Sequence, residues 1–156
     1  MQEIERKYLV ADESWREAVA QSMRIAQGYL CSRKVTARVR VCDDKGILTF
    51  KSKSHDGGLS RFEWERKIPL GVAGRLLCRC EGVVDKVRHI VEYKGYTFEI
   101  DEFHGDNEGL IVAEVELTHT DEEVALPPWL GDEVTGVRCF YNSFLSKCPF
   151  KSWHKR

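Results

Sequence analysis

Charged and apolar side chains alternate at the start of the chain, which reads MQEIERKYLV. Successive side chains of an extended strand point to opposite faces, so Glu3, Glu5 and Lys7 would share one face, with Ile4 and Tyr8 on the other. Two carboxylates and an ammonium group in one row could bind a hard divalent cation and, beside it, an anion. A complete site of this kind needs further strands that carry the same groups.

The same alternation recurs in most of the strands that the sequence predicts. The charged members are Arg38 and Arg40, Lys51 and Lys53, Arg61, Glu63, Glu65 and Lys67, Lys86 and Arg88, Glu99 and Asp101, and Glu114 and Glu116. One such strand is typical of a solvated sheet face. Like charges two residues apart, about 7 Å, repel each other. The repeated separation of acidic pairs from basic pairs indicates that the acidic side chains and the basic side chains each bind a ligand of opposite charge.

A sheet that closes with this face inward would gather the charges in its interior. The expected fold class is α+β, mainly β: a closed or partly open antiparallel barrel of about eight strands with a few flanking helices. Asp43 to Gly46 is predicted to form a hairpin turn. Helices are predicted at residues 12–27, where Trp15, Val19 and Met23 recur at helical spacing, at 69–82 and at 140–147.

Carboxylates without histidine or thiol neighbours favour Mg²⁺ or Mn²⁺, which in turn bind phosphate oxygens. Arginine and lysine bind the remaining phosphate charge. A buried triphosphate carries about four to five negative charges, so it needs both kinds of cation. The chain has no G-x-x-x-x-G-K-[ST] loop, and a phosphate site would therefore be built from strand side chains.

Length and composition narrow the alternatives. The 156 residues suit one domain, 1–156, and the net charge of -1 gives no basic field for nucleic acid. No apolar run reaches the roughly 18 residues of a membrane span, and no secretory segment follows Met1, so we expect a cytoplasmic protein without a membrane partner. The six cysteines, Cys31 among them, are expected to be reduced, and Cys78 and Cys80 lack the second pair of a zinc site.

These motifs together resemble the CYTH superfamily, the triphosphate tunnel metalloenzymes. Residues 3–7 match its E-x-E-x-K signature, and an R-x-R at 38–40, a K-x-R at 86–88 and an E-x-E at 114–116 follow in the family's order. The resemblance extends along almost the whole chain, and the short length is similar to the compact bacterial branch. It implies a triphosphate-binding tunnel in the barrel.

The resemblance also implies roles for individual residues. The expected metal ligands are Glu3, Glu5, Asp101, Glu114 and Glu116. The expected substrate-binding residues are Lys7, Arg38, Arg40, Lys51, Lys86, Arg88 and Arg138. Lys51, Lys86, Glu5 and Glu116 are expected to be catalytic. Glu63, Glu65 and Glu99 are expected either to orient the basic residues or to bind a second metal. Whether Tyr29, Lys53, Arg61 and Arg138 reach the ligand stays open.

The implied activity is hydrolysis of a triphosphate with Mg²⁺ or Mn²⁺ as cofactor. Inorganic tripolyphosphate is the favoured substrate, because the charged face shows no aromatic pocket for an organic group. A water held by the metal or a carboxylate would attack a terminal phosphorus while basic residues neutralise the departing diphosphate. The alternatives are a thiamine triphosphate or nucleotide triphosphatase, a class IV-type adenylate cyclase and a non-catalytic polyphosphate-binding module. Both a monomer and a homodimer remain open.

Overall fold

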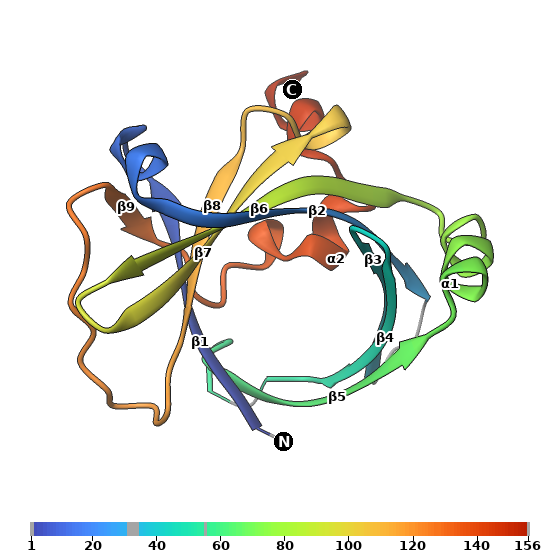
Figure 1. The fold of residues 1–156 in the computed structure, drawn as a ribbon, viewed down its shortest axis with the longest axis horizontal. Coiled ribbons are helices and arrows are strands. Elements are labelled where there is room, and N and C mark those ends of the chain that lie inside the picture. Colours follow the sequence, from blue (N-terminus) through green and yellow to red (C-terminus); the bar gives the residue numbers. More distant parts are fainter. Residues whose placement is uncertain (1, 31–34, 55, 156) are drawn as a thin grey trace.

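The computed structural model describes residues 2–30, 35–54 and 56–155 (Figure 1). Its strands are β1 Gln2–Val10, β2 Val19–Leu30, β3 Val35–Cys42, β4 Lys45–Ser52, β5 Ser60–Ile68, β6 Val83–Tyr93, β7 Tyr96–His104, β8 Ile111–Glu116 and β9 Leu130–Glu133. The α-helices are α1 Leu70–Leu77 and α2 Asn142–Leu145. Short 3₁₀ helices lie at Ser14–Ala18, Gly105–Asn107, Arg138–Phe140 and Phe150–Lys155.

The strands form one antiparallel sheet that closes into a ring (Figure 1). Its order is β5-β4-β3-β2-β6-β7-β8-β1-β9, and the start of β1 also pairs with β5. Glu3 lies opposite Arg61 of β5, whereas Glu5 lies opposite Glu116 of β8. The two halves of β1 therefore join the two ends of the ring. The predicted antiparallel barrel is confirmed, with β9 as an additional strand beside β1.

Apolar side chains form two core clusters, one on the outer face of this ring and one on its inner face. On the outer face, Phe98 and Val115 pack with Trp15 and Trp129 in the larger core cluster. On the inner face, Phe103 and its neighbours pack against Leu145 of α2 in a second cluster. Helix α2 lies within the outline of the ring in Figure 1. This apolar contact holds α2 against the inner face, where Asn142 and Ser143 line the same cavity as the charged rows.

The prediction of a helix over residues 12–27 is wrong. Only Ser14–Ala18 forms a 3₁₀ helix, and β2 begins at Val19. Strand β2 pairs with β3 on one side and with β6 on the other, where Met23 lies opposite Arg88. Two ladders of backbone hydrogen bonds outweigh the weak helical preference of this segment. Trp15, which seemed to begin a helical face, is fully buried against the ring of His89.

The other two predicted helices are confirmed in part. Helix α1 follows Pro69 but ends at Leu77, five residues before Gly82, and α2 is a single turn. The predicted hairpin turn is confirmed in place, although it is tighter: β3 ends at Cys42, β4 begins at Lys45, and Asp43 has φ 52. Gly46 lies inside β4, where an added Cβ would be 2.7 Å from Cβ of Ala73. This glycine lets α1 pack closely on the sheet.

Two further sequence expectations concern membrane spans and cysteines. No helix in the described part of the chain is long and apolar enough to cross a bilayer. Cysteines 42, 78, 80, 139 and 148 have free thiols. Cys31 lies outside the described residues.

Candidate active site

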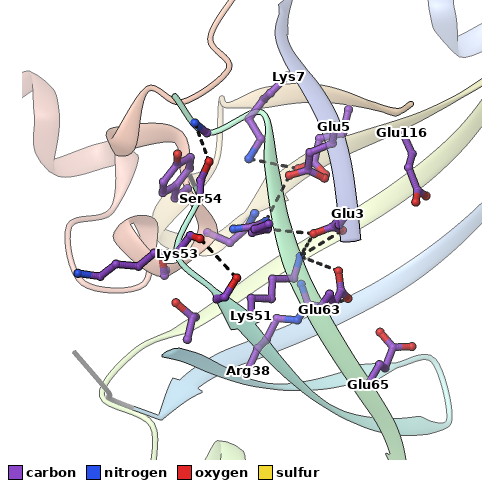
Figure 2. A pocket seen from close by; sticks show the side chains of 18 of the residues that line it. Glu3, Glu5, Lys7, Arg38, Lys51, Lys53, Ser54, Glu63, Glu65 and Glu116 are labelled. Carbon is purple, nitrogen blue, oxygen red and sulfur yellow. Dashed lines mark hydrogen bonds and ion pairs between the residues drawn. The ribbon is translucent and has the colours of Figure 1, made fainter. Parts of the chain in front are cut away.

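A cavity of about 1030 Å³ lies inside the ring, and charged side chains from most of the strands line it (Figure 2). Its acidic residues are Glu3, Glu5, Glu63, Glu65, Glu99, Glu114 and Glu116. Its basic residues are Lys7, Arg38, Arg40, Lys51, Lys53, Arg61 and Arg88. The period-2 rows of the sequence thus converge on one space, because each strand turns the same kind of face inward.

The carboxylates of β1 are bound by cations from β4 and β5. Lys51 Nζ lies 3.1 Å from Oε2 of Glu3 and 3.4 Å from Oε2 of Glu63. Arg61 bridges Glu3 and Glu5: its Nε lies 3.2 Å from Oε2 of Glu3, and its Nη2 lies 3.3 Å from Oε1 of Glu5. Burial opposes ionisation of Glu3, but Lys51 and Arg61 outweigh it and lower its pKa to about 2. Glu3 is therefore ionised and paired across the range in which enzymes work.

A second group of acidic residues lies where β1 meets β8. Burial and the neighbouring Glu114 raise the pKa of Glu5 to about 7. Lys7 Nζ lies 3.3 Å from Oε1 of Glu114. Glu116, opposite Glu5 in the ladder, is exposed to the cavity. The negative charges of Glu5 and Glu114 repel each other here, and a bound cation would stabilise both carboxylates.

Lys86 and Asp101 lie behind the cavity wall and do not line it. Lys86 is fully buried, and its Nζ donates to Oδ2 of Asp101 at 2.6 Å and to Oδ1 of Asn142 at 3.1 Å. Arg88 donates from Nε and Nη2 to the two oxygens of Asp101, at 2.7 and 2.9 Å. Burial lowers the pKa of Lys86 to about 7. The pKa of Asp101 falls to about 2 because Arg88 and Lys86 outweigh its burial.

Both oxygens of Asp101 are thus engaged by cations of the protein. Arg88 still reaches the cavity, where Nη1 lies 2.5 Å from Oε2 of Glu99. Through these contacts Asp101 can hold Arg88 and Lys86 in place. Glu99, whose side chain is 40% exposed, faces the cavity.

Arg40 hydrogen-bonds a neutral side chain, Gln27. Its Nε donates to Oε1 of Gln27 at 2.8 Å, and the amide of Gln27 donates to the hydroxyl of Tyr29 at 2.7 Å. Burial, followed by the charges of Arg38 and Arg88, lowers the pKa of Arg40 to about 10. Clustered guanidinium groups of this kind favour a multiply charged anion.

Four residues whose reach was open are now placed. Tyr29, Lys53 and Arg61 line the cavity. Arg138, at the start of a 3₁₀ helix, is exposed and is not among the lining residues.

Loops supply lining residues that the strand pattern could not predict. Ser54, Gly57 and Gly58 come from the loop between β4 and β5, and Tyr141 and Asn142 come from the segment around α2. The Nζ of Lys7 lies 5.5 Å from the centroid of the Tyr141 ring. The predicted helix at 140–147 gave no reason to place its side chains in the barrel.

The donor chemistry of the cavity fits a hard divalent cation. Every acidic lining group offers carboxylate oxygen, and none of the histidines and cysteines that the structure describes lines the cavity. Burial and the charge of Glu114 raise the pKa of Glu5, and a cation bound to these carboxylates would favour their ionised form. Within residues 2–30, 35–54 and 56–155, however, no three acidic, histidine or cysteine side chains are already gathered as a metal site. Basic side chains form ion pairs with several of these carboxylates instead.

A close glycine contact joins the β4–β5 loop to the segment before α2. Gly136 has φ 74, and an added Cβ would lie 1.8 Å from the carbonyl oxygen of Gly57. Gly57 has a similar φ of 66, but an added Cβ there meets nothing within 4 Å. The two positions therefore share the backbone strain and differ in the clash.

We expect Gly136→Ala to lower the free energy of unfolding by about 1–3 kcal/mol more than Gly57→Ala, because overpacking adds to the same strain. Denaturant unfolding of both variants measures the difference. Equal losses would contradict the close packing of this loop.

Comparisons with known proteins agree with this architecture. The CYTH domain matches residues 1–141. The chain is 42% identical over 154 residues to the inorganic triphosphatase of Acetivibrio thermocellus, covering 97% of each chain. It is 34% identical over 150 residues to the inorganic triphosphatase of Nitrosomonas europaea, covering 94% of this chain and 97% of that one. The chain therefore belongs to the CYTH family.

Solved structures show the same fold. The crystal structure of the inorganic triphosphatase NE1496 superposes with a TM-score of 0.69 at 29% identity, covering 92% of this chain and 93% of the other. A Hippeastrum protein named as an adenylyl cyclase with dominant triphosphatase activity has a TM-score of 0.61, covering 75% of this chain and 80% of the other. Its 17% identity supports the fold alone. Members of this family generally depend on a divalent metal.

Proposed function

We propose that this chain is a metal-dependent triphosphatase that hydrolyses inorganic tripolyphosphate to diphosphate and phosphate. The observation that carries the proposal is the cavity itself, which combines seven basic with seven acidic lining side chains. A triphosphate bound there would be neutralised by both the basic side chains and the metal. The two relatives of 42% and 34% identity, both named inorganic triphosphatase, support the same assignment.

In this proposal the two signs of charge have separate tasks. Glu5, Glu114 and Glu116, with Glu3, would hold Mg²⁺ or Mn²⁺. The metal would polarise phosphoryl oxygens and lower the pKa of a bound water. Arg38, Arg40, Lys51 and Arg88 would bind phosphate oxygens, and their charge would stabilise the departing diphosphate. Glu63 and Glu65 would orient the basic side chains.

We propose a part for Lys86 and Asp101 that differs from the one the sequence motif implies. Neither lines the cavity, and both are fully paired behind it. We therefore infer that Asp101 positions Arg88 and Lys86 instead of binding metal. Lys86, whose pKa lies near 7, would influence the substrate through Asn142, which lines the cavity, and through Asp101, which binds Arg88.

A substrate panel tests this proposal. Tripolyphosphate, thiamine triphosphate, ATP and diphosphate are each incubated with Mg²⁺ or Mn²⁺, and phosphate, diphosphate and cyclic nucleotide are measured. We expect tripolyphosphate to have the highest kcat/KM and diphosphate to remain intact. Cyclic AMP as the main product from ATP would favour the cyclase instead, and binding without any turnover would favour a polyphosphate-binding module.

A further inference from the structure

Arg61 lies where the two ends of the barrel meet. It is opposite Glu3 in the β1–β5 ladder, and its guanidinium reaches both acidic residues of the first strand, Glu3 and Glu5. Its side chain is 27% exposed, so it borders the cavity and is not sealed in the wall. The attraction of these two carboxylates outweighs burial and raises the pKa of Arg61.

A divalent cation that binds Glu3 and Glu5 together would compete with Arg61 for Oε2 of Glu3 and Oε1 of Glu5. Metal ligands must be free of protons and of competing cations. The guanidinium would also repel a metal ion placed between Glu3 and Glu5. A metal that takes these two oxygens displaces Arg61, and the released guanidinium then lies in a cavity in which a triphosphate needs positive charge.

Resting on the proposed function, we propose that Arg61 is an exchangeable counter-ion that holds Glu3 and Glu5 until metal binds and then moves to the triphosphate. The exchange makes metal and substrate binding mutually favourable, because the metal releases a substrate-binding group. It also explains why no metal cluster is assembled among the described residues despite the many carboxylates.

The test is Mn²⁺ titration of the purified protein by calorimetry, together with steady-state kinetics on tripolyphosphate. Arg61→Gln should bind Mn²⁺ about tenfold more tightly than the wild type, because the competing charge-assisted bonds are absent. Its KM for tripolyphosphate at saturating Mn²⁺ should rise at least about fivefold, because one phosphate ligand is lost. The exchange thus predicts two opposite changes in Arg61→Gln, tighter binding of Mn²⁺ and a higher KM for tripolyphosphate.

Two controls separate this exchange from a general loss of charge. Arg40→Gln also removes a cation from the cavity, but Arg40 hydrogen-bonds Gln27 and not a carboxylate of β1. Its Mn²⁺ affinity should change by less than about threefold, as expected for a screened charge without a direct bond. Arg66→Gln alters the same strand at an exposed position of the opposite face, and both constants should stay at the wild-type values.

The outcomes are distinguishable. An equal Mn²⁺ affinity in Arg61→Gln and Arg40→Gln, with a wild type that binds Mn²⁺ and hydrolyses tripolyphosphate, would overturn the exchange alone. A wild type that binds no Mn²⁺ would overturn the metal site and the proposed function with it. If Arg61→Gln does not fold, Arg61→Lys serves in its place, because it keeps the charge but loses the two-point bridge. Its Mn²⁺ affinity should exceed that of the wild type, and an unchanged value counts against the exchange.

Discussion

Glu5→Gln is expected to lower the turnover of tripolyphosphate at saturating Mg²⁺ by about a hundredfold or more while the fold stays intact. The amide removes a metal ligand at the centre of the acidic group, where charge develops during the reaction. Stability without metal should hold or rise at pH 8. The pKa of Glu5 in the folded protein is about 7, above its ordinary value, so the ionised carboxylate is a cost that the amide does not carry.

Circular dichroism melting and initial rates measure the two effects. Glu133→Gln is the matched control: Glu133 pairs with Arg6, and neither residue lines the cavity. Its turnover should match that of the wild type. A Glu5→Gln protein that unfolds without metal, or that keeps its full rate, would show that Glu5 serves a structural ion pair.

Asp101→Asn is expected to lower the free energy of unfolding by about 3–5 kcal/mol, because it removes the buried negative charge that Lys86 and Arg88 share. Lys86 and Arg88 both donate to Asp101, which is 1% exposed. The loss should shrink in acid. The pKa of Asp101 is lowered to about 2, so its stabilisation is fully present above its ordinary value of 3.8 and is lost as the pH falls toward 2.

Denaturant unfolding between pH 3 and pH 8 measures this prediction, and Glu99→Gln is its control. Glu99 also pairs with Arg88, but its side chain is 40% exposed, so the amide should cost less than about 1 kcal/mol. In Asp101→Asn the KM for tripolyphosphate should also rise, because Arg88 is no longer held in place. Equal losses in the two variants, or a loss that does not depend on pH, would contradict the buried network.

The alternation of charged and apolar residues predicted the barrel because it is a local property of each strand. Once Arg38, Glu63 or Glu114 is known to lie on the charged face of its strand, closure of the sheet brings these faces together. Residues 12–27 could not be predicted in this way. Strand β2 is determined by its two partner strands, and neither is visible in the spacing of Trp15 and Val19.

The limits of the site prediction have the same origin. The E-x-E and K-x-R motifs place side chains on a face, but they do not say how deep each one lies along its strand. Asp101 and Lys86 belong to the inward rows and yet lie behind the cavity, and the bridge from Arg61 to β1 depends on how the ring closes. Asn142 enters the site through α2, whose position is set by apolar packing of Leu145. That one domain spans residues 1–156 remains a prediction.

The most direct test of the account is the rate of tripolyphosphate hydrolysis against pH, measured at limiting and at saturating Mg²⁺. Protons and metal compete for Glu5, whose pKa without metal is about 7, so the rate at limiting Mg²⁺ should rise through neutral pH toward an alkaline optimum. Saturating Mg²⁺ should move the acidic limb to lower pH, because mass action favours the deprotonated, metal-bound carboxylates. A limb that stays in place, with saturation verified at each pH, or hydrolysis that proceeds equally without metal, would contradict the assignment of Glu3, Glu5, Glu114 and Glu116 as metal ligands.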